Sequence, residues 1–395
     1  MTKPRTLLFA LLTAVACTGL SQADEPLTPD PRIKTGKLAN GVSWMYRQHN
    51  LPPGKMALMI HVGSGSLSET EEQRGLAHFI EHMAFNGSEN FPPGKLVPYF
   101  ESIGMEFGHD LNAFTSFDQT VYMLFLPDTT SEEMDKALMV LSDYAYRLSL
   151  LPDEIDKERG VILEELRAGQ GAQQRLRDQL FEKLFVDTRL GKRLPIGLEK
   201  VIKNVQGPEF EAYYRTWYRP DRITLMIVGD APPEPYLPLI EKWFGQYKST
   251  ADAKPAPGPE MKPFTQERAL VLSDPEYDQG DVDIYNISPG RPPTTTLEQA
   301  RVDLIEEVGS WIMDRRFSER IKKGQASFRE ASARATRFFN DAMLVNAATV
   351  GEPKDWEKMV DELTLEVSRA RVDIGTPFLP ESTIKAPTLF SSWVS

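Results

Sequence analysis

The chain has 395 residues, of which 41% are hydrophobic, so it is long and apolar enough to form cores in two or three domains. Its formal net charge is −12 at pH 7. Nucleic acids are bound mainly through basic surfaces, and bulk charge therefore argues against a nucleic-acid partner.

The first 23 residues have the pattern of a secretory signal peptide. Lys3 and Arg5 supply its basic start, and residues 7–16 form an apolar stretch that is too short to span a membrane. Small residues just before Asp24 suit cleavage at that point. We therefore expect an exported protein, periplasmic or extracellular, with no stable membrane span.

Cys17 is the only cysteine, and it lies inside this signal segment. A lipoprotein anchor at Cys17 is an alternative interpretation of the same residues. However, Ala14 stands where a lipoprotein signal has a bulky aliphatic residue, so simple cleavage is favoured. The mature chain would then contain no thiol, which excludes disulfide bonds and zinc–thiolate sites.

Two strands are predicted near the start of the mature chain. Residues 42–46 follow the turn signal Asn40-Gly41. Residues 56–62 form an apolar run that ends at Gly63. Signals for a helix open at Glu72, and this helix carries the most informative motif of the sequence.

The motif is His78-Phe79-Ile80-Glu81-His82, which reads H-x-x-E-H. In a helix, His78 and His82 lie one turn apart on one face, where two imidazoles can take two corners of a tetrahedral Zn²⁺ site. Glu81 lies beside them and can serve as general base for a metal-activated water. This order is the signature of the inverzincins. A surface helix could carry the same letters without binding a metal.

A third ligand could come from residues 156–166. Glu158, Ile162 and Glu165 are spaced so that they share one face of a helix. One carboxylate could then bind the metal while the other lies beside it. A solvated acidic helix face would give the same spacing. Between this segment and the motif, Thr130 opens an amphipathic helix with a capping box.

Further elements follow in the second part of the chain. Residues 223–229 read as a buried strand, and we predict another strand at 269–272 and helices at 297–322 and 355–371. Apolar side chains at helical spacing are interpreted as core faces: Leu297, Ala300, Leu304, Val308 and Trp311 in the first helix, and Met359, Leu363 and Val367 in the second.

The order of strands and helices predicts an α+β fold, with mostly antiparallel sheet packed against helices. Residues 251–263 are rich in Ala, Pro and Lys and are interpreted as a linker. The predicted segments are a signal peptide at 1–23, a first domain at 24–250, the linker at 251–263, a partial second domain of similar type at 264–372, and an irregular tail at 373–395.

The run 63–87, which contains the motif, resembles the pitrilysin/insulinase metallopeptidases, peptidase family M16. Residues 158–165 are similar to a downstream element of that family, in which two glutamates are seven residues apart. The resemblance implies an M16-like first domain. In it, His78, His82 and Glu165 would be the zinc ligands, with Glu164 as the alternative to Glu165. Glu81 would be the catalytic base, and Glu158 an accessory residue of the catalytic site.

Asn112, Ala113 and Phe114 form a further point of resemblance. In the family, an N-A-x-T segment forms an edge strand that pairs with the substrate backbone. The resemblance therefore implies that these three residues bind the peptide. The same letters would also open an ordinary strand, because the run 120–126 reads as strand in any case.

The resemblance implies a zinc-dependent endopeptidase that acts on peptides or small unfolded proteins. Family members close two halves around the substrate, and this chain matches only the first half. We therefore expect the chain to be part of a longer protein, or to work with a second M16-type half in cis or in trans. The alternative is a non-catalytic or incomplete subunit that binds peptide or pairs with another half.

Overall fold

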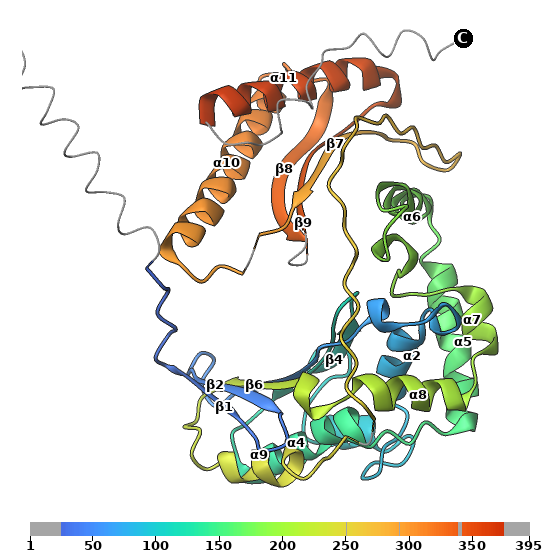
Figure 1. The fold of residues 1–395 in the computed structure, drawn as a ribbon, viewed down its shortest axis with the longest axis vertical. Coiled ribbons are helices and arrows are strands. Elements are labelled where there is room, and N and C mark those ends of the chain that lie inside the picture. The colour runs from blue at the N-terminus through green and yellow to red at the C-terminus, as the bar shows by residue number, and fades with distance from the viewer. Residues whose placement is uncertain (1–24, 250, 292, 339–341, 375–395) are drawn as a thin grey trace, which may run out of the picture. The chain divides into compact units, whose positions relative to one another are not determined.

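The computed structural model describes residues 25–249, 251–291, 293–338 and 342–374 (Figure 1). The predicted signal segment and most of the predicted tail lie outside the described residues. The chain divides into two compact units, one formed by Pro29–Glu260 and the other by Met261–Ser395 together with Met1–Thr28. Within the described ranges, no helix is both long and apolar enough to cross a membrane.

The unit Pro29–Glu260 mixes strands and helices along its length. In chain order these are β1 (Ile33–Lys37), β2 (Ser43–Gln48), β3 (Met56–Val62), α2 (Leu76–Met83), α3 (Leu96–Ser102), β4 (Leu111–Thr115), β5 (Thr120–Leu126), α4 (Ser131–Tyr146), α5 (Pro152–Ala168), α6 (Ala172–Leu184), α7 (Glu199–Asn204), α8 (Gly207–Trp217), β6 (Ile223–Gly229) and α9 (Leu237–Phe244).

Its strands form one six-stranded sheet in the order β1-β2-β6-β3-β5-β4. Only β2 and β6 run parallel, and every other neighbouring pair is antiparallel. Residues of β3 alternate between buried and half-buried positions, so one face of the sheet packs on the core and the other is more open. The strand β4, which follows the H-x-x-E-H motif in sequence, lies at one end of the sheet.

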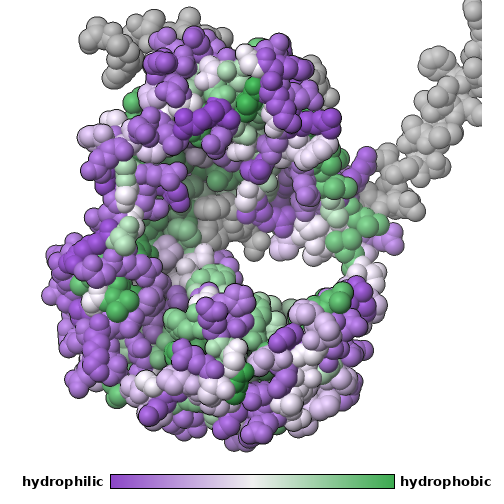
Figure 2. All heavy atoms as spheres, turned by 180° about the vertical axis from the view of Figure 1, so that it is seen from behind, coloured by the Kyte–Doolittle hydropathy of each residue, from purple (hydrophilic) through white to green (hydrophobic). Residues whose placement is uncertain are grey.

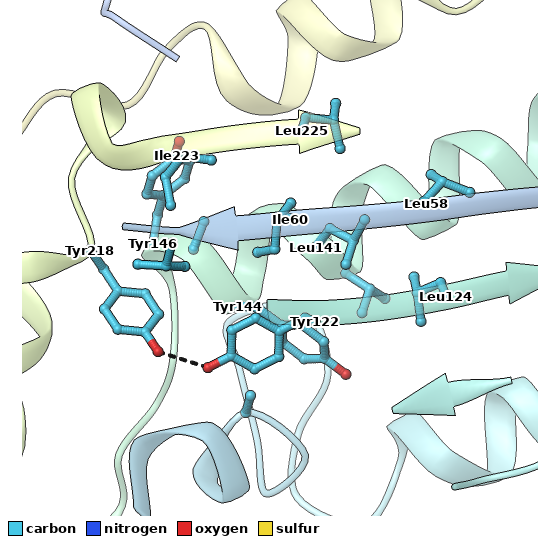
Figure 3. Packing of buried hydrophobic residues seen from close by; sticks show 14 of the residues in the cluster. Leu58, Ile60, Tyr122, Leu124, Leu141, Tyr144, Tyr146, Tyr218, Ile223 and Leu225 are labelled. Atoms are coloured by element: carbon cyan, nitrogen blue, oxygen red, sulfur yellow. Dashed lines mark hydrogen bonds between the residues drawn. The ribbon is translucent and has the colours of Figure 1, made fainter. Parts of the chain in front are cut away.

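The core of this unit lies between the sheet and its helices (Figure 3). Leu58 from β3, Leu124 from β5 and Leu141 from α4 are fully buried and point into it. Burying each such side chain stabilises the fold by about 1.5–3 kcal/mol. The hydroxyl groups of Tyr122 and Tyr218 form a buried hydrogen bond of 2.8 Å, which satisfies both polar groups inside the core.

Several predicted elements of this unit are confirmed. The strands at 56–62 and 223–229 match β3 and β6 residue for residue. Thr130 caps α4, because its side chain accepts a hydrogen bond from the N–H of Glu133. The reciprocal half of the predicted capping box does not form, because the N–H of Thr130 donates to Asp128 Oδ1 instead of to Glu133. The predicted α+β class with mostly antiparallel sheet is also confirmed.

The other unit builds a three-stranded sheet in the order β7-β9-β8, with all neighbours antiparallel. Met313, Phe317 and Leu363 are fully buried in its hydrophobic core, which joins two helices to the sheet. Its elements are β7 (Gly280–Pro289), α10 (Leu297–Lys322), β8 (Phe328–Phe338), β9 (Ala342–Gly351) and α11 (Trp356–Ile374).

The predicted core face of α10 is wrong, although the helix itself has the predicted bounds. Leu304 is 58% exposed and Trp311 60% exposed, while the buried positions are Gly309, Ser310, Met313 and Phe317. The described sheet beneath α10 has three strands. The helix contacts the core through Met313 and Phe317, which both lie in its C-terminal half. The apolar stripe nearer its start therefore stays at the surface. The core face predicted for α11 is confirmed, since Met359, Leu363 and Val367 are buried.

The strand predicted at 269–272 is not formed. These residues lie in an irregular segment, because no strand among the described residues pairs with them. Val271 within this segment is 85% exposed.

In the view of Figure 2, polar side chains cover most of the surface, and apolar side chains appear in scattered patches.

Candidate metal centre

Helix α2 carries the H-x-x-E-H motif, and Gly75, the N-cap residue just before it, has no side chain to cap the helix. The fully buried carboxyl group of Glu69 takes this role. It accepts hydrogen bonds from the N–H of Gly75 at 3.0 Å and of Ala77 at 2.9 Å. These bonds satisfy N–H groups that the start of a helix leaves unpaired. Glu69 thereby fixes the start of α2 immediately before His78.

The turn before α2 also lies against the loop that ends at Gly197. Gly75 has φ +100 and Gly197 has φ +77, and a Cβ atom on Gly197 would lie 2.2 Å from the Cα atom of Gly75. Glycine is required at this contact by both its backbone conformation and its lack of a side chain. The same loop supplies Pro195 and Ile196 to the wall of the cleft beside the motif.

Helix α5 supplies the carboxylates. Pro152 stands in its first turn, where the missing N–H of proline breaks no helical hydrogen bond. Ile155 and Ile162 are the buried residues of this helix and join the core. Glu158 and Glu165 reach the two histidines of α2, so the face that the spacing predicted is the face that meets the motif.

Three donor groups converge between α2 and α5. His78 Nε2 lies 3.7 Å from Glu165 Oε1, and His82 Nε2 lies 3.5 Å from Glu165 Oε2. One ligand atom from each of these three residues lies within 4.8 Å of the others. Ligands of a tetrahedral zinc, each about 2.1 Å from the metal, are about 3.4 Å apart. The donor types are those of a zinc site, and the two histidine–glutamate distances are close to this spacing.

Glu158 holds His82 from the opposite side. His82 Nδ1 lies 2.8 Å from Glu158 Oε1, and the amide of Asn86 donates a hydrogen bond of 2.5 Å to Glu158 Oε2. A carboxylate on Nδ1 fixes the ring orientation and leaves Nε2 free for a metal. Sequence reasoning gave Asn86 no role; it lies in the turn that follows the C-terminal end of α2 at Met83.

The electrostatics of the two histidines differ. Burial, and then the neighbouring His82, lower the pKa of His78 to about 4, so His78 is neutral near pH 7. Burial also acts to lower the pKa of His82, but the hydrogen bond to Glu158 and the carboxylates of Glu81 and Glu165 outweigh it and raise that pKa. The pKa of Glu158 is lowered, because His82 and Asn86 outweigh its own burial.

Glu81 is buried beside these ligands. Burial raises the pKa of Glu81 to about 7, while His82 and the hydrogen bond from Thr115 act in the opposite direction. Thr115 Oγ1 donates that bond to Glu81 Oε2 at 3.1 Å and lies at the end of β4. A general base works best when its pKa is near the working pH, and the position and pKa of Glu81 suit this role. The part of Thr115 was not foreseen from the sequence.

The donor groups open onto a cleft of about 490 Å³. The ring of Phe85 packs edge-on against that of Phe107, with ring centroids 5.3 Å apart. The cleft is lined by His78, Glu81, His82, Phe85, Phe107, Asn112, Ala113, Phe114, Thr115, Glu165, Pro195 and Ile196.

The three residues expected to bind peptide lie on β4, at the rim of this cleft. The strand pairs with β5 on one side, and its other edge pairs with no strand in the described chain. Asn112 is exposed, and its side chain makes local hydrogen bonds to Gly108 O and from the N–H of Ala113. The alternative ligand Glu164 is exposed, forms an ion pair with Arg167, and is absent from the cleft lining.

A helix with H-x-x-E-H facing a carboxylate on a second helix, at the edge of a mostly antiparallel sheet, is the arrangement expected of inverzincin zinc peptidases. The chain belongs to peptidase family M16. Residues 46–195 match the model for insulinase (peptidase family M16), and residues 204–374 match the model for the peptidase M16 inactive domain. All motif residues of the candidate centre fall within the first of these matches.

Two curated relatives illustrate the similarity. The chain is 32% identical over 302 residues to the probable zinc protease PqqL of Escherichia coli (strain K12). This alignment covers 76% of this chain and 32% of that protein. It is 34% identical over 223 residues to the zinc protease PQQL-like of Arabidopsis thaliana. This second alignment covers 56% of this chain and 23% of that protein. The aligned part of the chain thus spans about a third or less of these relatives.

Solved structures agree with this comparison. The crystal structure of the first half of the periplasmic protease PqqL from Escherichia coli matches with a TM-score of 0.79 and 29% identity, over 87% of this chain and 73% of that chain. The structure of the periplasmic protease PqqL itself matches with a TM-score of 0.80 and 28% identity, over 87% of this chain and 38% of that chain.

Proposed function

We propose that this chain is the zinc-binding half of an exported zinc-dependent endopeptidase that hydrolyses peptides or small unfolded proteins. The observation that carries the proposal is the convergence of His78, His82 and Glu165 within 4.8 Å. A buried glutamate lies beside them, as does β4, whose outer edge pairs with no other strand of the described residues. Export is supported by the signal-like segment of the sequence and by the similarity to a periplasmic protease.

In this proposal, His78 and His82 would hold the metal through their Nε2 atoms, and Glu165 through its carboxylate. Zinc bound there supplies Lewis-acid activation of water and of a peptide carbonyl. Glu81 accepts the proton of the attacking water and then donates a proton to the amine that leaves. Thr115 holds the Glu81 carboxylate in place through Oε2, so that the other oxygen can face the water. Glu158 orients His82 and acts as a positioning residue.

The substrate is proposed to bind as an extended strand along the free edge of β4. Main-chain hydrogen bonds to the outward-facing N–H and C=O groups of residues 112–114 would hold the peptide whatever its side chains. Each such bond is worth only about 0.5–1.5 kcal/mol net. Positioning by this edge alone is therefore weak, and further contacts with the peptide are needed for efficient cleavage.

A second M16-type half, in cis or in trans, is proposed to supply further contacts. The aligned part of this chain covers 32% of the probable zinc protease PqqL and 38% of the PqqL chain in the crystal. Zinc binding and efficient hydrolysis are therefore proposed to depend on different parts of the protein. The described unit Pro29–Glu260 contains every proposed zinc ligand, while efficient hydrolysis requires the other half.

The test uses an internally quenched peptide library and the zinc-loaded chain, alone and with the second half added or fused. We expect slow cleavage by the chain alone, faster cleavage by the completed assembly, and loss of both after treatment with a chelator. Zinc should restore the activity. Cleavage that survives removal of the metal would contradict the proposal. Zinc binding without cleavage by either form would support the alternative of a peptide-binding subunit.

A further inference from the structure

Four methionines form a continuous row across the six-stranded sheet. The strand registers pair Met45 on β2 with Met226 on β6, Met226 with Met59 on β3, and Met59 with Met123 on β5. Directly opposed residues on neighbouring strands point to the same face of a sheet, so the four side chains lie side by side. The chain has 14 methionines, and four of them are therefore concentrated in one line across one face.

This row lies on the open face of the sheet. On β3, Leu58 and Ile60 are fully buried against the core, whereas Met59 between them points away and is only half-buried. Met226 and Met123 are also half-buried, and Met45 is 44% exposed. Apolar side chains on a solvent-facing sheet surface are unusual, because antiparallel sheets normally place polar residues there.

A second apolar row runs beside the first. Val228 on β6 is paired with Ala57 on β3, and Ala57 is paired with Phe125 on β5. Val228 is 41% exposed and Phe125 is 36% exposed. The two rows together make a contiguous apolar surface, which we call the methionine face: Met45, Met59, Met123, Met226, Ala57, Val228 and Phe125.

The methionine face is continuous with the strand at the candidate metal centre. Met123 is paired with Asn112 of β4, which lines the cleft. Phe114, two residues further along β4, points to the same face, is 43% exposed and also lines the cleft. A polypeptide that lies in the cleft can therefore pass from β4 directly onto the methionine face.

We propose that the methionine face binds apolar segments of an unfolded polypeptide while another part of the same polypeptide lies at the metal centre. This inference rests on the proposed peptidase function and names its substrate class. Methionine side chains are flexible and polarisable, and they adapt to apolar partners of many shapes. Such a face selects for exposed apolar residues in general and not for one sequence.

The geometry sets a minimum length for the substrate. Four strand spacings of about 4.8 Å separate β4 from β2, a span of roughly 19 Å. An extended chain covers this distance with about six residues. Polypeptides that reach at least this far beyond the residues paired with β4 can contact the whole row, whereas shorter peptides cannot.

The test uses three dye-labelled peptides with one shared core sequence of five residues, the length of β4 (Leu111–Thr115). The first is the core alone, the second adds an apolar-rich extension, and the third adds a polar extension of the same length. Binding to the zinc-loaded chain with Glu81→Gln is measured by fluorescence anisotropy. We expect the apolar extension to lower Kd about tenfold, which equals about 1.4 kcal/mol. The polar extension should leave Kd unchanged.

Variants of the methionine face then test whether the tighter binding of the apolar-extended peptide arises there. Combined Met59→Gln and Met226→Gln should remove it, because glutamine has a similar length but a polar end, while Met59→Leu and Met226→Leu should keep it. Leu304→Gln with Val308→Gln is the matched control, since these exposed residues lie on α10, and it should also keep the tighter binding. Equal binding of the two extensions, or full binding by the glutamine variant, would overturn the proposal.

A second measurement covers the case in which the glutamine variant does not fold. Bound apolar-extended peptide should slow peroxide oxidation of Met45 in the otherwise unmodified Glu81→Gln chain, measured by mass spectrometry. Met139 on α4, which is half-buried and away from this face, should oxidise at the same rate with and without peptide. Unchanged oxidation of Met45 with bound peptide would contradict the inference.

Two other outcomes are kept apart by the same experiment. If the glutamine variant changes the oligomeric state in analytical ultracentrifugation but not the affinity for the extended peptide, the face is an interface between copies and the inference is wrong. If the peptides bind as expected but the unmodified chain, completed by its second half, cleaves none of them, the proposed peptidase function fails while the peptide-binding face stands.

Discussion

Glu158 Oε1 lies 2.8 Å from His82 Nδ1, on the side of the imidazole away from Glu165. Glu158 is itself held by the amide of Asn86. This pair orients His82 so that its Nε2 atom faces the space between His78 and Glu165. The second glutamate of the acidic helix face therefore supports a ligand and does not itself lie among the proposed ligands.

Replacing Glu158 tests this support. Glu158→Gln should lower zinc affinity by about 10–100-fold, the range typical for loss of an outer-shell partner of a metal ligand. Zinc Kd is measured by competition with a chelating dye. Glu154→Gln is the matched control on the same helix, because Glu154 pairs with Lys157 and does not contact the histidines. An unchanged Kd for Glu158→Gln would show that His82 needs no orienting carboxylate.

The third ligand is tested by two neighbouring glutamates. Glu165→Gln should weaken zinc binding more strongly than Glu158→Gln, because it removes a carboxylate from the metal itself. Glu164→Gln should leave the affinity unchanged, since Glu164 is paired with Arg167 at the surface. Elemental analysis after gel filtration compares the two variants. Loss of zinc from Glu164→Gln with retention by Glu165→Gln would reverse the assignment.

Zinc binding should depend on pH through His82. A histidine must be neutral to bind a metal, and the raised pKa of His82 means that it keeps a proton at pH values where an ordinary histidine has lost one. Affinity should therefore rise as pH increases through and above about 6.5. Calorimetry at about pH 6.5 in two buffers of different ionisation enthalpy measures proton release. We expect more than half a proton released per zinc, because a pKa raised above 6.5 leaves most His82 side chains protonated at this pH, and no release would contradict the ionised state of His82.

The contact between Gly75 and Gly197 predicts a stability effect. Gly197→Ala would place a Cβ atom 2.2 Å from the Cα atom of Gly75, and the start of α2 would have to move. We expect a loss of about 2–4 kcal/mol in the free energy of unfolding, together with weaker zinc binding. Chemical denaturation measures the first effect, and dye competition the second.

Gly94→Ala is the matched control for this variant. Gly94 has φ +73, close to the φ +77 of Gly197, but a Cβ atom there would meet nothing within 4 Å. Its cost should be limited to the backbone conformation, about 1 kcal/mol, with no change in zinc affinity. Equal effects of the two substitutions would show that the close approach of Gly197 to Gly75 has no consequence.

The sequence predicted some elements in detail because their signals are local. The strand β3 is an apolar run that ends at Gly63, and α4 begins after Thr130, whose side chain caps it. The shared face of Glu158 and Glu165 also follows from helical spacing alone. These features depend on residues close together in the chain, so no knowledge of the tertiary fold was needed.

Other features depend on contacts between distant segments. The parallel pairing of β2 with β6 joins residues about 180 positions apart, as in Ser43 with Thr224, and nothing local predicts it. The exposed stripe of α10 was misinterpreted because periodicity identifies an apolar face but not what covers it. The hydrogen bond from Thr115 to Glu81 likewise requires β4 to lie beside α2.

In the proposed mechanism, His78, His82 and Glu165 hold a zinc ion and Glu81 acts as the base. The most direct test of this mechanism is Glu81→Gln in the completed two-half assembly, with zinc content and kcat/KM measured on the same preparation. We expect about one zinc per chain, as in the unmodified protein, and a fall in kcat/KM of at least about a hundredfold. Normal hydrolysis by the zinc-loaded variant would contradict the mechanism.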